Sequence, residues 1–159
     1  MKIFVMRHGE AEIAAATDQL RALNDVGKKQ ANQQGKWLKN QLESNELSLE
    51  KIIVSPYIRA QQTFECLNLA FEEKLVKEDW KGITPYGSPN NVLNYLAVLA
   101  EQGIKCVLLI SHLPLVGEIV AELYGKSNPI AFYPATIAQL DWNGEKGKIE
   151  AYQYAKEVL

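Results

Sequence analysis

Three short runs rich in Ile, Val, Leu and Phe constrain the fold of this chain more than any other feature. They cover residues 2–6, 51–55 and 106–110, and none of them alternates apolar with polar side chains. A strand with one face in water would alternate, whereas a strand buried on both faces gives a nearly continuous apolar run. The three runs are therefore predicted to be central strands of a parallel sheet.

Segments of helical length separate and follow these runs, with apolar side chains at three- and four-residue spacing. They cover residues 25–42, 56–71, 89–102 and 113–124. Asn24 is expected to cap the first helix, and Ser55-Pro56 is expected to begin the second. Gly27 and Gly35 are expected to let the first helix lie close against the sheet. Strands that alternate with helices indicate βαβ units.

The C-terminal part of the chain has a different pattern. Residues 136–142 and 148–154 flank a polar, glycine-containing turn at 143–147, which predicts an antiparallel hairpin at the sheet edge. We find no repeat, low-complexity tract or Gly/Ser linker in the 159 residues. The expected fold is α/β: a three-layer α/β/α sandwich with a mostly parallel central sheet and an antiparallel edge hairpin, forming a single domain over residues 1–159.

Composition excludes several classes of function. Seventeen basic and nineteen acidic side chains leave a net charge of -2, which gives no footprint for nucleic acid or an anionic membrane. We see no apolar stretch long enough to cross a bilayer or to form a signal peptide core, so a cytoplasmic protein is expected. Cys66 and Cys106 lie in apolar segments and are expected to be reduced core residues.

Both histidines of the chain directly follow a predicted strand. Arg7-His8 comes after the first run, Ser111-His112 comes after the third, and Arg59 falls in the first turn of the helix after the second. The carboxyl ends of parallel strands meet at one edge of the sheet, where α/β proteins bind ligands. Arginine forks and helix N-termini both favour anions. These residues therefore predict a phosphate site.

In such a site, His8 is expected to act as a nucleophile. Repulsion from Arg7 and Arg59 disfavours a protonated ring and leaves a ring nitrogen available at neutral pH. His112, nearer to the phosphate oxygens, is expected to be able to serve in its protonated form. A single histidine at a strand end is usually structural, but two in the same setting, each after a polar or basic residue, favour chemistry.

These residues resemble the histidine phosphatase superfamily, also called the phosphoglycerate mutase-like family. The resemblance rests on Arg7-His8-Gly9-Glu10 and on the segments SPYIRAQQT at 55–63 and SHLPLV at 111–116. It extends from Met1 to near the C-terminus. The short chain and its segment 21–27 are most similar to the small bacterial phosphohistidine phosphatases of the superfamily.

The resemblance implies a role for each matching residue. His8 would become phosphorylated, and Arg7, Arg59 and His112 would bind the phosphoryl oxygens. Arg21 is a further candidate for phosphate binding, with a merely exposed loop arginine as the alternative. The implied reaction is a double displacement through a phosphohistidine intermediate, and it requires no metal or other cofactor.

The chain departs from its larger relatives in the stretch that supplies their general acid. That position falls on Gly82, while Glu78 and Asp79 lie upstream as possible acids or as solvated loop charges. An alkoxide leaving group gains much from a proton donor. An imidazole whose other nitrogen is protonated instead leaves as a neutral ring, whose conjugate acid has a pKa of about 6.5. The residues therefore favour a phosphoramidate substrate.

Access to the pocket favours the same substrate. Residues 72–88, between the second and third predicted helices, are too few for a large capping subdomain, so a histidine on another protein could reach the site. Trp80 and Tyr86 could line its rim or simply pack. The expected function is removal of phosphate from histidine on a signalling or phosphotransfer protein, such as a phosphotransfer domain or carrier. A small-molecule phosphomonoesterase or mutase and a catalytically idle phosphate-binding module are the alternatives.

Overall fold

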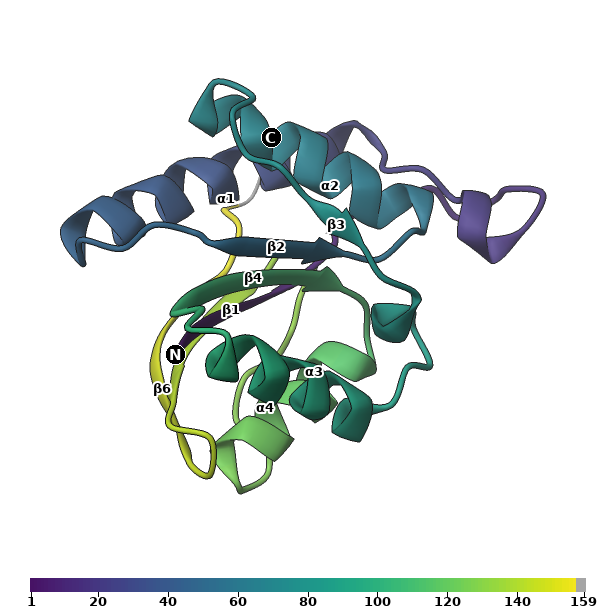
Figure 1. Ribbon diagram of the computed structural model, residues 1–159. Coiled ribbons are helices and arrows are strands. Elements are labelled where there is room, and N and C mark those ends of the chain that lie inside the picture. Colours follow the sequence, from purple (N-terminus) through teal and green to yellow (C-terminus); the bar gives the residue numbers. More distant parts are fainter. Residues whose placement is uncertain (157–159) are drawn as a thin grey trace.

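A computed structural model describes residues 1–156 as a six-stranded sheet with helices on both faces (Figure 1). The strands are β1 (Lys2–Arg7), β2 (Lys51–Val54), β3 (Glu78–Asp79), β4 (Cys106–Ser111), β5 (Ile137–Trp142) and β6 (Gly147–Gln153). The α-helices are α1 (Asp25–Ser44), α2 (Ile58–Asn68), α3 (Pro89–Glu101) and α4 (Leu115–Tyr124). Helices α1 and α2 cover one face, and α3 and α4 cover the other.

The sheet is mixed, with the strand order β3-β2-β4-β1-β5-β6. Strands β3, β2, β4 and β1 are parallel to one another, β5 pairs with β1 in antiparallel orientation, and β6 pairs with β5 in antiparallel orientation. The predicted α/β fold with an antiparallel edge hairpin is therefore confirmed. The single domain over residues 1–159 stays a prediction.

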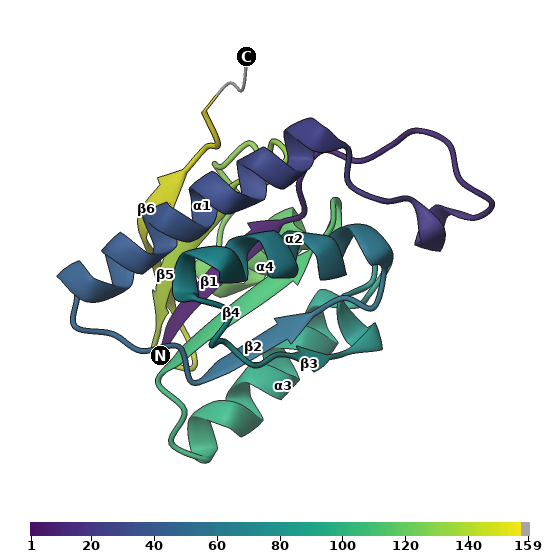
Figure 2. The same ribbon diagram turned by 90° about the horizontal axis from the view of Figure 1, so that it is seen from above.

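The apolar runs are continuous because successive side chains of a strand enter two different cores. In β1, Phe4 and Met6 pack with α1 and α2, whereas Ile3 and Val5 pack with α3 and α4. Every residue of β4 is buried. Figure 2 shows α1 and α2 lying across one face of the sheet, over its central strands.

The amino end of helix α1 confirms the predicted cap. Asn24 Oδ1 accepts a hydrogen bond from Gly27 N at 2.8 Å. The expected approach of the glycines to the sheet is wrong, because Gly27 lies against the backbone of Glu10 and Gly35 lies against the backbone of Leu67 in α2. The two glycines thus bring α1 close to the loop after β1 and to its neighbouring helix.

Two helix starts differ from their predicted positions. Helix α2 begins at Ile58 rather than at Pro56, because the Ser55 hydroxyl contacts His112 in the core and Tyr57 occupies the N-cap position. Helix α2 then ends at Asn68 and continues as a 3-10 turn to Phe71. Helix α4 begins at Leu115, two residues later than predicted.

The segment between α2 and α3 contains strand β3, which the sequence pattern did not predict. Glu78 and Asp79 pair with β2, and a 3-10 turn follows over Lys81–Ile83. Two residues are too few for an alternating or continuous apolar pattern. Trp80 N donates to Val54 O at 3.0 Å, which places this turn beside the carboxyl end of β2.

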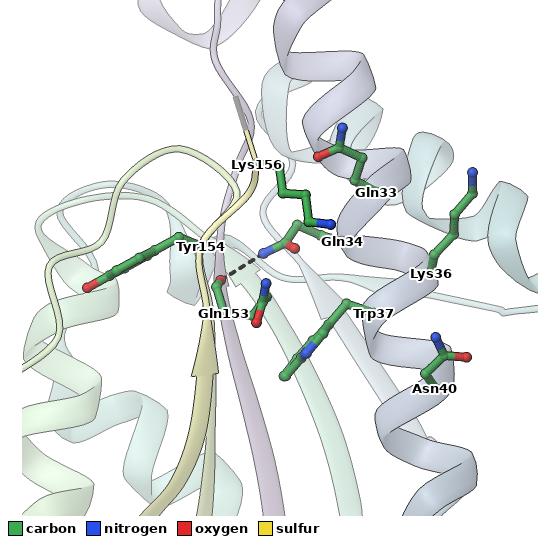
Figure 3. A pocket seen from close by; sticks show the side chains of 8 residues that line it. All are labelled: Gln33, Gln34, Lys36, Trp37, Asn40, Gln153, Tyr154 and Lys156. Carbon is green, nitrogen blue, oxygen red and sulfur yellow. Dashed lines mark hydrogen bonds between the residues drawn. The ribbon is translucent and has the colours of Figure 1, made fainter. Parts of the chain in front are cut away.

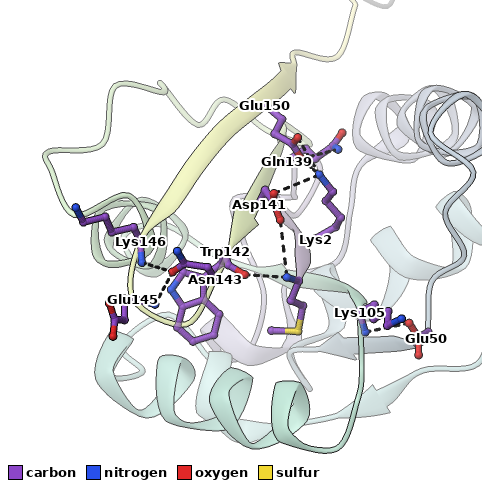
Figure 4. A network of polar contacts seen from close by, with 11 residues as sticks. Lys2, Glu50, Lys105, Gln139, Asp141, Trp142, Asn143, Glu145, Lys146 and Glu150 are labelled. Atoms are coloured by element: carbon purple, nitrogen blue, oxygen red, sulfur yellow. Dashed lines mark hydrogen bonds and ion pairs between the residues drawn. The ribbon is translucent and has the colours of Figure 1, made fainter.

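A network of polar contacts lies at the amino end of β1 (Figure 4). Lys2 Nζ lies 2.8 Å from Glu150 and 3.6 Å from Asp141, and the N-terminal amine donates to Trp142 O at 2.7 Å. These contacts fasten the edge hairpin to β1 at its amino end. These polar contacts lie at the end of β1 opposite to the one that carries Arg7.

Both cysteines in the described part of the chain are free thiols. Within residues 1–156, none of the helices is both long enough and apolar enough to cross a membrane.

Candidate active site

The backbone of His8 is held in place from two sides. His8 N donates to Ser111 O in the neighbouring strand at 3.0 Å, and His8 O accepts from Ala135 N at 2.9 Å. Gln34 of α1 in turn donates to Ala135 O and to Gln153 O, each at 2.8 Å, and the second of these bonds is visible in Figure 3. The sheet and α1 together set the position of His8.

The ring of His8 has a defined tautomer. Its Nδ1 lies 2.7 Å from Gly9 O, and a carbonyl can only accept, so Nδ1 carries the hydrogen. Nε2 is left with its lone pair, which accepts from Arg59 Nε at 3.2 Å. Burial, with help from the charges of Arg59 and Arg7, lowers the pKa of His8 to about 3. The predicted unprotonated ring is confirmed, with burial as a larger cause than repulsion.

His112 lies beside His8, with 5.1 Å between the ring centres. Its Nε2 is 2.7 Å from Ser55 Oγ. Burial, followed by the effects of His8 and Arg59, lowers the pKa of His112 to about 2. Desolvation thus strongly disfavours a charged His112 ring, while the expectation that it can serve protonated beside phosphate oxygens stays a prediction.

Arg59 is the second residue of α2 and is only 4% exposed. Besides its bond to His8, it donates from Nη1 to Asp18 O at 2.7 Å and from Nη2 to Asp18 Oδ2 at 3.1 Å. Its backbone carbonyl accepts from Thr63 Oγ1, which also accepts from Gly9 N. Thr63 thus connects the helix that carries Arg59 to the loop that contains His8 and Gly9.

Arg7 is the last residue of strand β1 and directly precedes His8. Its Nη1 donates to Phe132 O at 2.8 Å, while its Nε is buried and has no hydrogen-bond partner within residues 1–156. Burial, with a further effect of the Arg59 charge, lowers the pKa of Arg7. A buried donor without an acceptor on a cation indicates a place where an anion would be stabilised.

Arg21 joins this cluster through Asp18 rather than through the histidines. Arg21 Nη1 lies 3.0 Å from Asp18 Oδ1, and its Nε donates to Glu12 O at 2.8 Å. Although burial raises it, the bonds from Arg21 and Arg59 hold the pKa of Asp18 below its ordinary value. Sequence reasoning missed Asp18, since no local pattern connects an exposed loop carboxylate with the second helix.

The stretch around Gly82 lies beside the pocket. Ser111, the residue before His112, donates from Oγ to Ile83 O at 2.6 Å. A Cβ atom on Gly82 would overlap the Trp80 indole, which packs against Tyr95 of α3 with ring centres 4.8 Å apart. Trp80 therefore fills the space that a side chain at position 82 would need.

The two nearby carboxylates are engaged elsewhere. Glu78 accepts from Lys51 and from Tyr95, and Asp79 accepts from Lys77 and Gln61. The hydrogen bond from Lys51 lowers the pKa of Glu78, and although burial opposes it, the bonds from Lys77 and Gln61 lower the pKa of Asp79. Both are ionised at neutral pH. They are therefore poor proton donors, which agrees with the interpretation as loop charges.

The rim residues and the larger cavities add little to this site. Trp80 is half-buried against the core, and Tyr86 is 91% exposed. A cavity of about 390 Å³ lies between α1 and the end of β6 (Figure 3), and none of the five predicted site residues lines it. Within residues 1–156, no group of three or more His, Cys, Asp and Glu side chains is arranged to hold a metal ion.

The low pKa values of the two histidines predict a stability profile. Below its ordinary pKa of about 6.5, each histidine is protonated in the unfolded chain but stays neutral in the folded chain. The free energy of unfolding should therefore fall on acidification from about pH 7 to about pH 5, by up to about 1.4 kcal/mol per pH unit for each histidine. Urea unfolding followed by circular dichroism measures it, and His112→Gln should show a shallower slope. Identical slopes would contradict the assignment.

Comparisons with known proteins agree with this geometry. Residues 3–82 match the histidine phosphatase superfamily (branch 1). A phosphohistidine phosphatase SixA homolog of Haemophilus influenzae is 58% identical over 156 residues, or 96% of this chain and 95% of that protein. Phosphohistidine phosphatase SixA of Escherichia coli is 40% identical over 144 residues, or 88% and 84% of the two chains.

Among solved structures, the protein histidine phosphatase SixA complexed with tungstate superimposes with a TM-score of 0.87 at 36% identity, covering 97% of each chain. The likeness thus extends over both the sequence and the fold. The chain belongs to the histidine phosphatase superfamily.

Proposed function

We propose that this protein is a phosphohistidine phosphatase that removes the phosphoryl group from histidine on a signalling or phosphotransfer protein. The observation that carries the proposal is the His8 ring, whose hydrogen is fixed on Nδ1 by Gly9 O and whose Nε2 lone pair meets Arg59. The similarity to two SixA phosphatases supports the same reaction. His8 is the proposed nucleophile, and Arg7, Arg59 and His112 are the proposed phosphoryl ligands.

In the first step, the lone pair of His8 Nε2 forms a new P–N bond while the P–N bond to the substrate histidine breaks. The electron pair of the broken bond returns to the substrate ring. The other nitrogen of that ring is already protonated, so the ring leaves as neutral imidazole. His8 keeps its Nδ1 hydrogen on Gly9 O, where the positive charge of the phosphorylated ring is stabilised.

In the second step, a water oxygen attacks phosphorus and the bond to His8 Nε2 breaks. The electron pair returns to the ring. One proton of the water stays on the attacking oxygen and the other passes to a phosphoryl oxygen, so the products are dihydrogen phosphate and neutral His8. In both steps the charge on the phosphoryl oxygens is spread. Two arginines beside the phosphorus stabilise that charge by electrostatics, which is the main source of rate in phosphoryl transfer.

Arg59 has to change partners when substrate binds. Its Nε–H occupies the lone pair that must attack, so the donor turns from the ring to a phosphoryl oxygen. Its two terminal nitrogens each donate to Asp18, which also accepts from Arg21. We therefore assign Arg21 an indirect part in phosphate binding, through the position of Arg59.

The leaving group follows from the space around Gly82. Trp80 excludes a side chain there, and Glu78 and Asp79 are ionised and paired. Expulsion of an alkoxide would lack a proton donor from these residues, whereas expulsion of neutral imidazole does not need one. The pocket therefore suits a phosphoramidate better than an alkyl phosphate ester.

A single domain without a large cap leaves the pocket open to a phosphohistidine on a carrier or phosphotransfer domain. Free Cys66 and Cys106 support a reducing compartment such as the cytoplasm. The net charge of -2 offers no attraction to nucleic acid or to an anionic membrane.

A double substitution separates this proposal from a small-molecule phosphatase. Glu78→Gln combined with Asp79→Asn should leave turnover of a phosphohistidine-bearing carrier protein within about threefold of wild type, because neither carboxylate serves as an acid. Release of inorganic phosphate measures the rate, with phosphoserine as the alkyl ester and p-nitrophenyl phosphate as an activated ester. Preference of the wild type for phosphoserine, lost in the double variant, would instead establish an ester phosphatase with a working acid.

A further inference from the structure

The Ser55 hydroxyl and the His112 ring form a buried pair at the carboxyl edge of the sheet. Ser55 follows β2 and His112 follows β4, and the two residues are 0% and 1% exposed. Their contact, Ser55 Oγ to His112 Nε2, is 2.7 Å long. Ser55 Oγ also accepts a weaker bond of 3.3 Å from Tyr57 N. Neither group can turn to solvent, so either Ser55 Oγ or His112 Nε2 is the donor in this hydrogen bond.

The two possible positions of the His112 hydrogen, Nε2 and Nδ1, leave different numbers of buried polar groups unsatisfied. Within residues 1–156, the only hydrogen-bond partners of Ser55 Oγ are Tyr57 N and His112 Nε2, and His112 Nδ1 is buried without any partner. If Nε2 carried the hydrogen, the serine hydroxyl would have no acceptor and Nδ1 would have no donor. If the serine donates to Nε2, only the Nδ1 hydrogen is left unsatisfied. One buried unsatisfied group costs less than two.

We propose that Ser55 is a positioning residue that holds His112 as a neutral ring with its hydrogen on Nδ1, so that this N–H donates to the phosphoryl group during the reaction. The role in the reaction rests on the proposed function, whereas the tautomer stands on the contacts alone. Ser55 acts through His112 and touches no reacting atom. His112 then binds the phosphoryl group as a dipolar donor and not as a cation.

The surroundings of His112 explain why a neutral donor suits this place. The ring lies 5.1 Å from the His8 ring and 5.1 Å from the Tyr57 ring, and the Arg59 guanidinium lies over Tyr57. Burial, His8, Arg59 and Arg7 all disfavour a charge on His112, and Asp18 opposes them. A third cation would be repelled, and a lone pair facing phosphate would repel the anion. A hydrogen held toward the phosphoryl group avoids both costs.

Nuclear magnetic resonance on the wild-type protein tests the tautomer directly. Two-bond 1H–15N correlations of 15N-histidine-labelled protein distinguish a ring with Nδ1–H from one with Nε2–H and from a charged ring. The chain has only two histidines, so the His8→Ala spectrum assigns both. We expect the Nδ1–H pattern for His112 at neutral pH. An Nε2–H or imidazolium pattern overturns the proposal whatever the activity.

Two substitutions at Ser55 then test its part in positioning. Ser55→Ala should show a mixed tautomer pattern for His112 and a kcat toward the phosphohistidine carrier lower by about 10- to 100-fold, the effect of losing one orienting hydrogen bond. Ser55→Thr keeps the hydroxyl and should restore both the Nδ1–H pattern and most of the rate. An unchanged pattern in Ser55→Ala overturns the proposal. An Nδ1–H pattern in a wild type that lacks phosphohistidine turnover would instead overturn the proposed function.

Discussion

His8→Ala should lose turnover of a phosphohistidine-bearing carrier protein by at least about 10³-fold, because the attacking lone pair is gone and no other group can form the covalent intermediate. The substitution removes a ring that is only 7% exposed and that holds no hydrogen on the atom facing Arg59. A short incubation with a 32P-labelled carrier, followed by alkaline quench, should trap label on the wild type and none on the variant. Phosphohistidine survives base, whereas acid releases it.

The comparison requires that the variant be folded. His112→Gln is the matched control, since it also replaces a buried imidazole at the end of a central strand and keeps His8. This control should still become labelled, although slowly. Label that persists in His8→Ala would place the nucleophile elsewhere. Wild-type protein that binds the phosphorylated carrier but never becomes labelled would establish the idle binding module.

Arg59→Lys should lower kcat by about 10²- to 10³-fold while charge is conserved, because lysine cannot reproduce a fork that serves several acceptors at once. Arg59 donates from Nε to His8 and from its two terminal nitrogens to Asp18. A lysine ammonium would keep the attraction for phosphate, so KM should change much less than kcat. Steady-state kinetics with the phosphorylated carrier separates the two parameters.

Arg21→Lys is the matched control for this prediction. Arg21 contacts Asp18 and Glu12 O but neither histidine, so its replacement should lower kcat by less than about tenfold. An equal loss in the two variants would mean that Arg21 binds the phosphoryl group itself. A wild-type rate in Arg59→Lys would remove Arg59 from the transition state.

Much of the fold was predictable because burial acts on sequence through simple periods. The runs in β1, β2 and β4 are apolar on both sides since helices cover both faces of the sheet. Local chemistry also predicted the Asn24 cap. Strand β3 was not predictable, because its two residues pair with β2 through backbone atoms and carry no apolar pattern. The start of α2 was misplaced because Ser55 Oγ lies 2.7 Å from a distant histidine, and Tyr57 rather than Ser55 is the N-cap residue.

In the site, too, some features follow from the sequence pattern and others depend on packing. The strand ends predicted which arginines and histidines gather, since topology alone brings the carboxyl ends of parallel strands together. Their protonation states depended on packing that no motif contains. Burial lowers the pKa of His112, and the connection between Arg59 and Arg21 depends on the three-dimensional position of Asp18. The contact between Asp18 and Arg59 could not be predicted, because Asp18 is not at the end of a predicted strand.

The indole of Trp80 over Gly82 also limits how a lineage with this sequence can change its chemistry. A carboxylate gained at position 82 by a single mutation would meet Trp80 before it met any substrate. A smaller residue at position 80 would have to come first, and it would sacrifice the packing on Tyr95 beside strand β3. The step toward ester hydrolysis thus begins with a less stable protein that has gained no new activity. The packing of the core and the lack of a carboxylate at position 82 are therefore coupled through a single indole.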